Sequence, residues 1–251
     1  MSTTPSNRYT QMQRAFYDAE APNMAVENHF RHNTNPDYWD VLLGAVKRDR
    51  EAWRGKRALD IGCGAGRNVA NLLALCEWEA VDGCDIAEQN IIHARRWLKG
   101  LGYHRFNLYT TSGVDLQPIP DGQYDFIMST IVLQHIAVWE IRHQILRDVL
   151  RVARPGALFS FQMTMYPPGR PDTAGYFDNV WDAPGTNGNY DVDVPNPDVL
   201  MAELLDLGFK RPQFMLRPEW DYNREEHTVG GNTWIFVQAW TPATSSTSST
   251  P

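Results

Sequence analysis

The sequence contains little cysteine and no excess of basic residues, and each shortage excludes a class of protein. Its cysteines are odd in number and lack the paired spacing of metal sites: Cys63, Cys76 and Cys84. Reduced thiols in a cytoplasmic protein are therefore the simplest expectation. The formal net charge is −7, whereas proteins that bind nucleic acids gain most of their affinity from basic contacts to phosphates. We therefore expect no nucleic-acid partner.

Long apolar segments are missing too. Nowhere do about 18 uncharged apolar residues follow one another, as a membrane-spanning helix would require, and the first residues are polar, unlike a secretory signal. We expect a cytoplasmic location and no membrane partner. The hydrophobic share of 43% among 251 residues is enough for the core of one large α/β domain. The sequence leaves the oligomeric state open, a homodimer included.

The chain divides into a helical start, a central domain and a polar end. Residues 1–50 begin with a polar stretch and continue with amphipathic patterns, so we expect an N-terminal helical extension. The domain itself is expected over residues 51–240. Residues 241–251 are rich in serine and threonine and lack side chains to bury, which predicts a disordered tail.

Short apolar runs alternate with longer helical patterns through the central domain. We expect strands near residues 57–61, 80–86, 106–110, 124–130 and 157–165. Helices are expected between them near residues 67–77, 88–101 and 138–153. This alternation predicts an α/β fold, with a doubly wound and mostly parallel sheet covered by helices on both faces. Farther along, we expect a helix from Asn196 to Gly208 and strands near residues 209–216 and 233–240.

The alternation breaks after the fifth strand. Residues 166–197 are rich in proline, glycine, asparagine, aspartate and aromatic residues, and they are too many for an ordinary connection. We expect an ordered insertion that forms a lid over the site where an acceptor molecule binds. A self-packed loop is the simpler alternative.

The most informative segment is a glycine-rich turn after the first expected strand. Gly62, Gly64 and Gly66 precede a helical pattern, with the small Cys63 between them. Glycine permits positive φ and has no Cβ, so the chain can turn tightly against a bound molecule. A ligand can therefore touch the backbone here.

Two neighbours of the turn indicate the charge of that ligand. The fingerprint of dinucleotide-binding proteins requires its third glycine one residue later, where this chain has Arg67. Asp60 precedes the first glycine by two residues. A carboxylate there repels a pyrophosphate but attracts an ammonium group. A cationic ligand is therefore favoured over a polyanionic one.

An acidic residue follows at the end of the second apolar run. Asp85, with Ile86 after it, comes 19 residues after Gly66. A carboxylate in this place can accept hydrogen bonds from both hydroxyls of a ribose. Capping of the next helix is the structural alternative for Asp85, and the two roles are compatible.

Together these residues resemble the class I methyltransferases that use S-adenosylmethionine (SAM), which have a D-x-G-x-G-x-G turn and an acidic residue ending the second strand. The resemblance implies a Rossmann-like seven-stranded sheet of order 3-2-1-4-5-7-6 with an antiparallel last strand. It also implies SAM as cofactor, S-adenosylhomocysteine as product, and a cap over the cofactor by residues 1–50, for which a hydrophobic stripe packed on the sheet edge is the alternative. Residues near 113–115 would lie by the adenine and residues near 129–130 by the methionine. The assigned cofactor residues are Asp60, Gly62, Cys63, Gly64, Gly66, Asp85, Ile86, Gly113, Val114, Asp115, Ser129, Thr130 and Gln134.

The reaction is expected at the carboxyl ends of the strands, where open α/β sheets bind their ligands. His135 follows the fourth strand there. An alcohol is a poor nucleophile until its proton leaves, and an imidazole suits that proton transfer, so His135 is the candidate catalytic base. A structural histidine bonded to a loop carbonyl is the alternative. His143 is a weaker candidate because the arginines around it, Arg142 among them, predict a solvated helix face.

The insertion supplies candidates for binding the acceptor. Aromatic faces beside short carboxylates and amides suit a neutral polyhydroxylated molecule such as a sugar. The residues assigned to the acceptor are Tyr176, Trp181, Tyr190 and Asp191. Carboxylates of the insertion, and the segment 225–227 with two glutamates and a histidine, are also potential ligands of Mg²⁺ or Ca²⁺, but no spacing indicates a metal site.

The sequence thus predicts a SAM-dependent methyltransferase that acts on a small polar molecule. Methylation of a hydroxyl is favoured, with a sugar as the narrower hypothesis. N-methylation or carboxyl methylation of a small metabolite is the alternative within the same class, and aminopropyl transfer is another enzymatic alternative. A SAM-binding module without turnover is an alternative of a different class. An NAD-dependent dehydrogenase is disfavoured by the glycine spacing and by Asp60.

Overall fold

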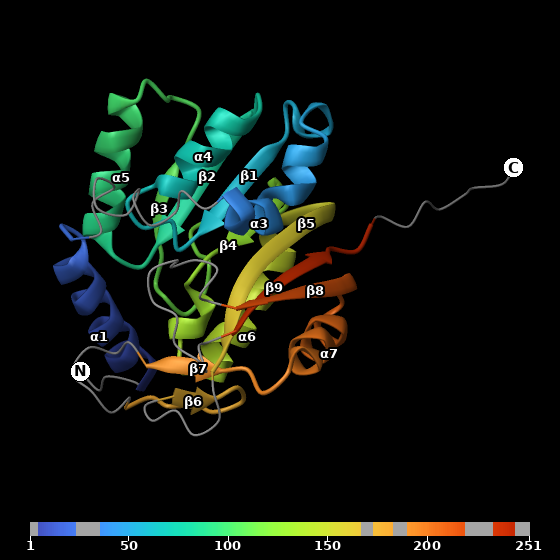
Figure 1. The fold of residues 1–251 in the computed structure, drawn as a ribbon. Helices are drawn as coiled ribbons and strands as arrows, with labels where there is room; N and C mark the ends of the chain where they lie inside the picture. Colours follow the sequence, from blue (N-terminus) through green and yellow to red (C-terminus); the bar gives the residue numbers. More distant parts are fainter. Residues whose placement is uncertain (1–4, 24–35, 167–172, 183–189, 219–232, 244–251) are drawn as a thin grey trace, which may run out of the picture.

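A computed structural model describes residues 5–23, 36–166, 173–182, 190–218 and 233–243 (Figure 1). Seven strands form one sheet in the order β3-β2-β1-β4-β5-β9-β8. Their bounds are β1 Arg57–Ile61, β2 Ala80–Asp85, β3 Leu108–Thr110, β4 Tyr124–Ser129, β5 Ala153–Met165, β8 Lys210–Pro218 and β9 Thr233–Trp240. The first five run parallel, whereas β9 is antiparallel to both β5 and β8. The expected order 3-2-1-4-5-7-6, with an antiparallel last strand, is confirmed.

Helices cover both faces of this sheet. On one face lie α3 (Pro36–Arg48), α4 (Arg67–Leu75) and α5 (Glu88–Gly100), and on the other lie α6 (Trp139–Val152) and α7 (Pro197–Leu207). Neighbouring strand residues alternate between the two cores, as Ala58 and Phe126 join the first while Leu59 and Ile127 join the second. This alternation follows from the period of two residues in a strand. The predicted doubly wound fold is therefore confirmed.

The helix α7 has the ends that its sequence predicts. The side chain of Asn196 accepts a hydrogen bond from the Val199 amide at 3.3 Å, which caps the first turn. Gly208 closes the helix with φ of 104°, a left-handed conformation that glycine adopts readily.

The strand β5 begins earlier than predicted. The sequence analysis expects this strand near residues 157–165, whereas the observed strand begins at Ala153 and includes Pro155 and Gly156. The pairing with β4 shifts register between Tyr124 and Phe126, and Gly156 has φ of 77°. An irregularity inside the strand thus accommodates residues that ordinarily end one.

Part of the insertion after β5 lies within the described residues. It contains two short strands, β6 (Thr173–Gly175) and β7 (Asp191–Asp193), which pair in parallel. The Val194 amide donates to the Thr164 carbonyl, and the Trp139 amide donates to the Asp178 carbonyl. The insertion is therefore tied to β5 and to the start of α6. Residues 167–172 and 183–189 lie outside the described part.

Two residues are buried where the sequence analysis expects exposure. Arg142 is 1% exposed, and its guanidinium donates to the carbonyls of Ile136 and Tyr176. The expectation of a solvated helix face is therefore wrong for Arg142, whose charge is satisfied by backbone carbonyls. Thr241, assigned to the tail, is also buried, and its hydroxyl bonds the backbone of residues 154 and 157.

Candidate functional site

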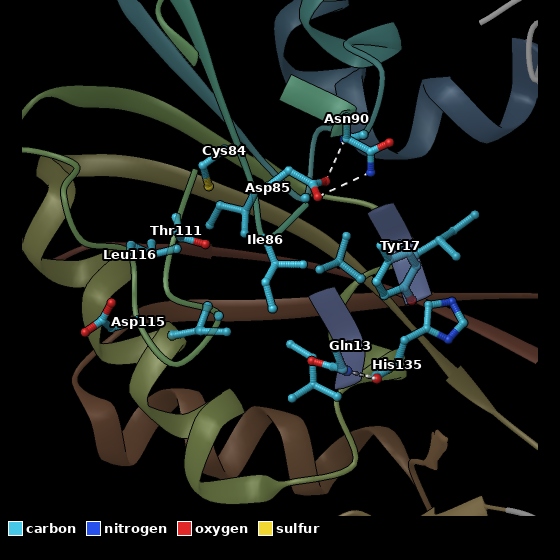
Figure 2. Close-up of a pocket in the computed structure, with 18 residues that line it drawn as sticks. Gln13, Tyr17, Cys84, Asp85, Ile86, Asn90, Thr111, Asp115, Leu116 and His135 are labelled. Atoms are coloured by element: carbon cyan, nitrogen blue, oxygen red, sulfur yellow. Dashed lines mark hydrogen bonds between the residues drawn. The ribbon is translucent and has the colours of Figure 1, made fainter. Parts of the chain in front are cut away.

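A cavity opens at the carboxyl ends of β1, β2, β3 and β4 (Figure 2). About 790 Å³ of this space, open solvent at its mouth included, is not filled by protein atoms. The residues that line it are Gln13, Tyr17, Ile61, Gly62, Gly64, Cys84, Asp85, Ile86, Asn90, Thr111, Gly113, Asp115, Leu116, Ile131, Val132, His135, Ile136 and Ile145.

The glycine-rich turn forms one wall and depends on having no side chains. Gly62, Gly64 and Gly66 have φ of 71°, 50° and 91°, values that other residues rarely adopt. A Cβ added to Gly62 would lie 2.2 Å from Cγ2 of Val132. The turn can therefore pack against the loop after β4 only with glycine at this position. Gly66 and the neighbouring Cys63 do not line the cavity.

Asp60 is fully buried behind this turn. Neither of its carboxylate oxygens has a hydrogen-bond partner among the described residues. Burial raises its pKa to about 8, and the nearby charge of Arg67 opposes that rise. Asp60 does not line the cavity. A buried carboxylate without donors is costly as an anion, so this position favours an added cation or a bound proton.

Asp85 holds the turn from the neighbouring strand. Its Oδ2 accepts from the Gly64 amide at 2.9 Å, and its Oδ1 accepts from the Ala87 amide at 2.8 Å and from Asn90 at 3.3 Å. Oδ1 of Asn90 is buried and has no partner among the described residues. The end of β2 thus presents an unsatisfied acceptor beside a carboxylate. The sequence analysis does not identify Asn90, which lies in the first turn of α5 (Glu88–Gly100).

The loop after β3 closes another side of the cavity. Gly113 has φ of 86°, and a Cβ added there would lie 2.3 Å from Cδ1 of Ile86. Asp115 lines the cavity and accepts from the Ser112 hydroxyl at 2.8 Å. Val114 is partly buried against the core and does not line the cavity. Of the residues assigned to the adenine, Gly113 and Asp115 are thus at the cavity wall.

The residues that the sequence analysis assigns to the methionine part of SAM lie behind the cavity wall. The Ser129 hydroxyl donates to the Ile61 carbonyl at 3.2 Å. Thr130 is 7% exposed, and its hydroxyl has no partner among the described residues. Gln134 is buried and accepts two hydrogen bonds from β5, described below. None of the three lines the cavity.

His135 lines the cavity and is held by a carboxylate of the insertion. Its Nδ1 lies 2.6 Å from Oδ1 of Asp191, and both side chains are mostly buried, at 18% and 16% exposed. The Tyr166 hydroxyl donates to the other oxygen of Asp191 at 2.6 Å. Figure 2 shows the imidazole beside Tyr17 at one side of the cavity. This arrangement fixes the ring and directs its Nδ1 at an anion, which suits a base that acts through Nε2.

The first helix of the chain, α1 (Pro5–Glu20), covers part of the cavity. Gln13 and Tyr17 line the cavity, and the Gln13 amide donates to the His135 carbonyl at 2.8 Å. Arg14 donates to the carbonyls of Ile86 and Thr111, each at 3.2 Å. One helix thus contacts the loops after β2, β3 and β4. Burial and nearby carboxylates raise the pKa of Tyr17, so its hydroxyl stays protonated at neutral pH.

The other residues assigned to the acceptor do not line the cavity. Tyr176 is 3% exposed, and its hydroxyl bonds Glu203 of α7. Trp181 is partly buried and meets Tyr9 edge to face at 6.3 Å, and Tyr190 is partly buried against the core. Asp191 reaches the site through His135. The insertion therefore contributes a carboxylate that contacts His135 behind the cavity wall, and aromatic side chains that pack around it.

Neither a metal site nor a membrane segment is found within the described part of the chain. No group of three or more His, Cys, Asp or Glu side chains is placed there to hold a metal ion. The segment 225–227, considered above as a source of ligands, lies outside the described residues. No helix in the described ranges is long and apolar enough to cross a membrane.

The sequence matches known proteins over its central part. A family model described as a methyltransferase domain matches residues 59–161. Human thiol S-methyltransferase TMT1A is 31% identical over 103 residues, which make up 41% of this chain and 40% of the human protein. The chain thus spans less than half the length of this relative.

Solved structures share the fold over most of the chain. Geranyl diphosphate C-methyltransferase from Streptomyces coelicolor has a TM-score of 0.63 at 11% identity, covering 95% of this chain and 99% of that one. Phosphoethanolamine N-methyltransferase 2 from Haemonchus contortus has a TM-score of 0.60 at 13% identity, covering 88% and 60%. At such low identities these likenesses show the fold alone. The family model shows a methyltransferase domain over residues 59–161, and the solved structures show that the chain has the fold of these enzymes.

Proposed function

We propose that the cavity binds SAM. The observation that supports it is the glycine turn together with Asp60, whose buried oxygens have no donor among the described residues. The ammonium group of SAM is a cation of the kind this carboxylate favours. The solved methyltransferases described above were both crystallised with S-adenosylhomocysteine, which supports the same ligand class here.

The remaining contacts follow from the arrangement of the loops. Asp85 and the unsatisfied Oδ1 of Asn90 would receive the ribose hydroxyls. The loop with Gly113 and Asp115 would face the adenine. A carboxylate has about four acceptor sites, and three donors already bond Asp85. Asn90 is therefore needed to complete the proposed ribose site.

We further propose that His135 is a catalytic base in methyl transfer to a small molecule. SAM supplies an electrophilic methyl group. The acceptor hydroxyl becomes nucleophilic as its proton passes to Nε2 of His135, and the carboxylate of Asp191, 2.6 Å from Nδ1, stabilises the charged ring. Asp191 then acts on the base and not directly on the acceptor, which differs from the role that its sequence suggests. Deprotonation matters most for hydroxyls and thiols, whereas an amine needs only to be delivered neutral.

The acceptor class follows from this chemistry. A hydroxyl compound is the first candidate, with a saccharide as the narrower hypothesis from the composition of the insertion. A thiol is the second candidate, because the human relative is named as a thiol S-methyltransferase and a base activates a thiol in the same way. N-methylation and carboxyl methylation remain the alternatives that would need no base.

The test is transfer of label from methyl-labelled SAM to sugars, phenols, thiols, amines and carboxylic acids. Methylation of a hydroxyl compound that His135→Gln lowers roughly 10²-fold or more, with SAM affinity unchanged, supports the proposal. His104→Gln, at an exposed histidine that does not line the cavity, is the matched control. Turnover of amines or acids alone contradicts hydroxyl methylation.

The binding of SAM is tested separately. Binding of SAM without any turnover identifies the non-catalytic alternative, and unchanged SAM affinity in Asp85→Ala refutes the ribose assignment.

A further inference from the structure

Ile131, in the wall of the cavity, has a strained backbone. It follows β4 and has φ of 56°, the left-handed region. This conformation is unfavourable for a β-branched residue and persists only where neighbouring groups hold it. Ile131 and Val132 line the cavity, and His135 follows them in the same loop. The geometry of the loop therefore depends on whatever holds Ile131.

A buried amide on the neighbouring strand makes that contact. Gln162 of β5 is 0% exposed, and its Oε1 accepts from the Ile131 amide at 3.0 Å. Its Nε2 donates to Oε1 of Gln134 at 2.7 Å and lies within 3.3 Å of the Met163 carbonyl and the Thr164 hydroxyl. The Thr164 hydroxyl also donates to Oε1 of Gln134, at 2.7 Å. Both ends of the loop between Ile131 and Gln134 thus meet one side chain.

The amide of Gln162 satisfies both partners at neutral pH. The Ile131 amide can only donate, so it needs an acceptor, whereas Oε1 of Gln134, which also accepts from the Thr164 hydroxyl, can only accept. A carboxylate at this position has no proton for Gln134, and an aliphatic side chain satisfies neither partner. A buried polar group left without a partner destabilises the arrangement that contains it.

We propose that Gln162 is a positioning residue for methyl transfer, since it holds Ile131 in its left-handed conformation and thereby sets the wall that carries His135. This inference rests on the proposed function. Gln162 does not line the cavity, so it acts through the loop and contacts neither acceptor nor cofactor in this arrangement. A small displacement of this wall misaligns the base with the acceptor, which lowers kcat more than it weakens substrate binding.

The test compares Gln162→Leu and Gln162→Glu. Loss of both hydrogen bonds in Gln162→Leu is expected to lower kcat roughly 10²-fold while KM for SAM changes little. Gln162→Glu keeps an acceptor for Ile131, and its buried carboxyl has a raised pKa. Its protonated form can donate to Gln134, so the activity of the variant relative to wild type rises as the pH falls. Gln213→Leu and Gln213→Glu, at an exposed glutamine of β8, are the matched controls.

Hydrogen exchange of the Ile131 amide in the ligand-free protein is the second readout. Protection is expected to be lost in Gln162→Leu and retained in Gln162→Glu. Folded Gln162→Leu with wild-type kcat, or with unchanged protection of Ile131, overturns the proposal, as does a loss of thermal stability alone. Wild-type protein that binds SAM but transfers no methyl group refutes the proposed function instead, and the exchange of Ile131 then still decides whether Gln162 holds the loop.

Discussion

Nδ1 of His135 and Oδ1 of Asp191 lie 2.6 Å apart although 56 residues separate them in the chain. The contact joins the loop after β4 to the strand β7 of the insertion. The Tyr166 hydroxyl holds the second oxygen of Asp191 at 2.6 Å, so the carboxylate is fixed from both sides. Whether the insertion orients the imidazole can therefore be tested by changing Asp191 and leaving His135 as it is.

Asp191→Asn is expected to lower kcat roughly 10²-fold with little change in SAM affinity, because the amide cannot stabilise a charged imidazole as a carboxylate does. Steady-state kinetics measures kcat, and calorimetry measures the affinity for SAM. Asp193→Asn is the control, since this neighbouring carboxylate accepts from the Tyr166 amide. An unchanged kcat in Asp191→Asn would separate Asp191 from the base.

Gly62→Ala is expected to destabilise the fold and abolish SAM binding. The added Cβ would lie 2.2 Å from Val132 at a φ of 71°, combining a clash with a disfavoured backbone conformation. Gly55→Ala is the matched control, because Gly55 has φ of 69° but no atom within 4 Å of the added Cβ. The backbone effect is roughly 1–2 kcal/mol in either variant, and overpacking adds about 1–3 kcal/mol at Gly62. Urea denaturation measures the difference, and equal losses would show that the packing against Val132 is unimportant.

The stability of the ligand-free protein is expected to fall as the pH rises, through Asp60. Its pKa is about 8 in the folded protein and 3.8 as its ordinary value, so between these values the folded state binds more protons than the unfolded state. This contribution is complete below the lower value and is lost as the pH rises through the upper one, by up to about 1.4 kcal/mol per pH unit. Urea titrations at several pH values compare wild type with Asp60→Asn. A difference between them that is constant from pH 5 to 8 would contradict the assignment.

Arg14→Ala is expected to raise the Kd for SAM about ten-fold. The guanidinium bonds the Ile86 and Thr111 carbonyls, and hydrogen bonds from charged groups contribute roughly 1.5–3 kcal/mol. Without them α1 is docked for a smaller fraction of the time, and the apparent affinity falls by that fraction. Calorimetry measures the Kd for SAM, with Arg8→Ala as control because Arg8 forms an exposed ion pair with Asp182. Equal affinities in the two variants would show that α1 does not contribute to the site.

The strands and the glycine turn were predictable because their signals are local. Gly62, Gly64 and Asp85 lie close in sequence, and a strand, a turn and a helix follow one another there. The alternation of apolar runs likewise indicates the sheet order once the family resemblance is included. The start of β5 was predicted too late, because Pro155 and Gly156 in the missed part are typical of a turn as well as of an irregularity inside a strand.

The contacts that complete the site were not predictable, because they join distant segments. Asp191 is typical of a loop carboxylate, and only the folded insertion brings it to His135. Gln162 lies within an expected strand, where nothing local shows that its amide holds Ile131. Arg142 shows the converse, since a helical arginine is usually exposed and here the insertion covers it.

The way in which α1 is attached has a consequence for local opening of the fold. Its side chains bond carbonyls that are 72, 97 and 122 residues away in sequence, and those carbonyls belong to loops whose shape depends on the finished sheet. The helix is joined to these loops by a few side-chain hydrogen bonds, whereas the strands are joined by continuous ladders, so we expect α1 to open at a lower free energy than the strands. Hydrogen exchange of α1 that is as slow as that of β1 and β4 would contradict this expectation.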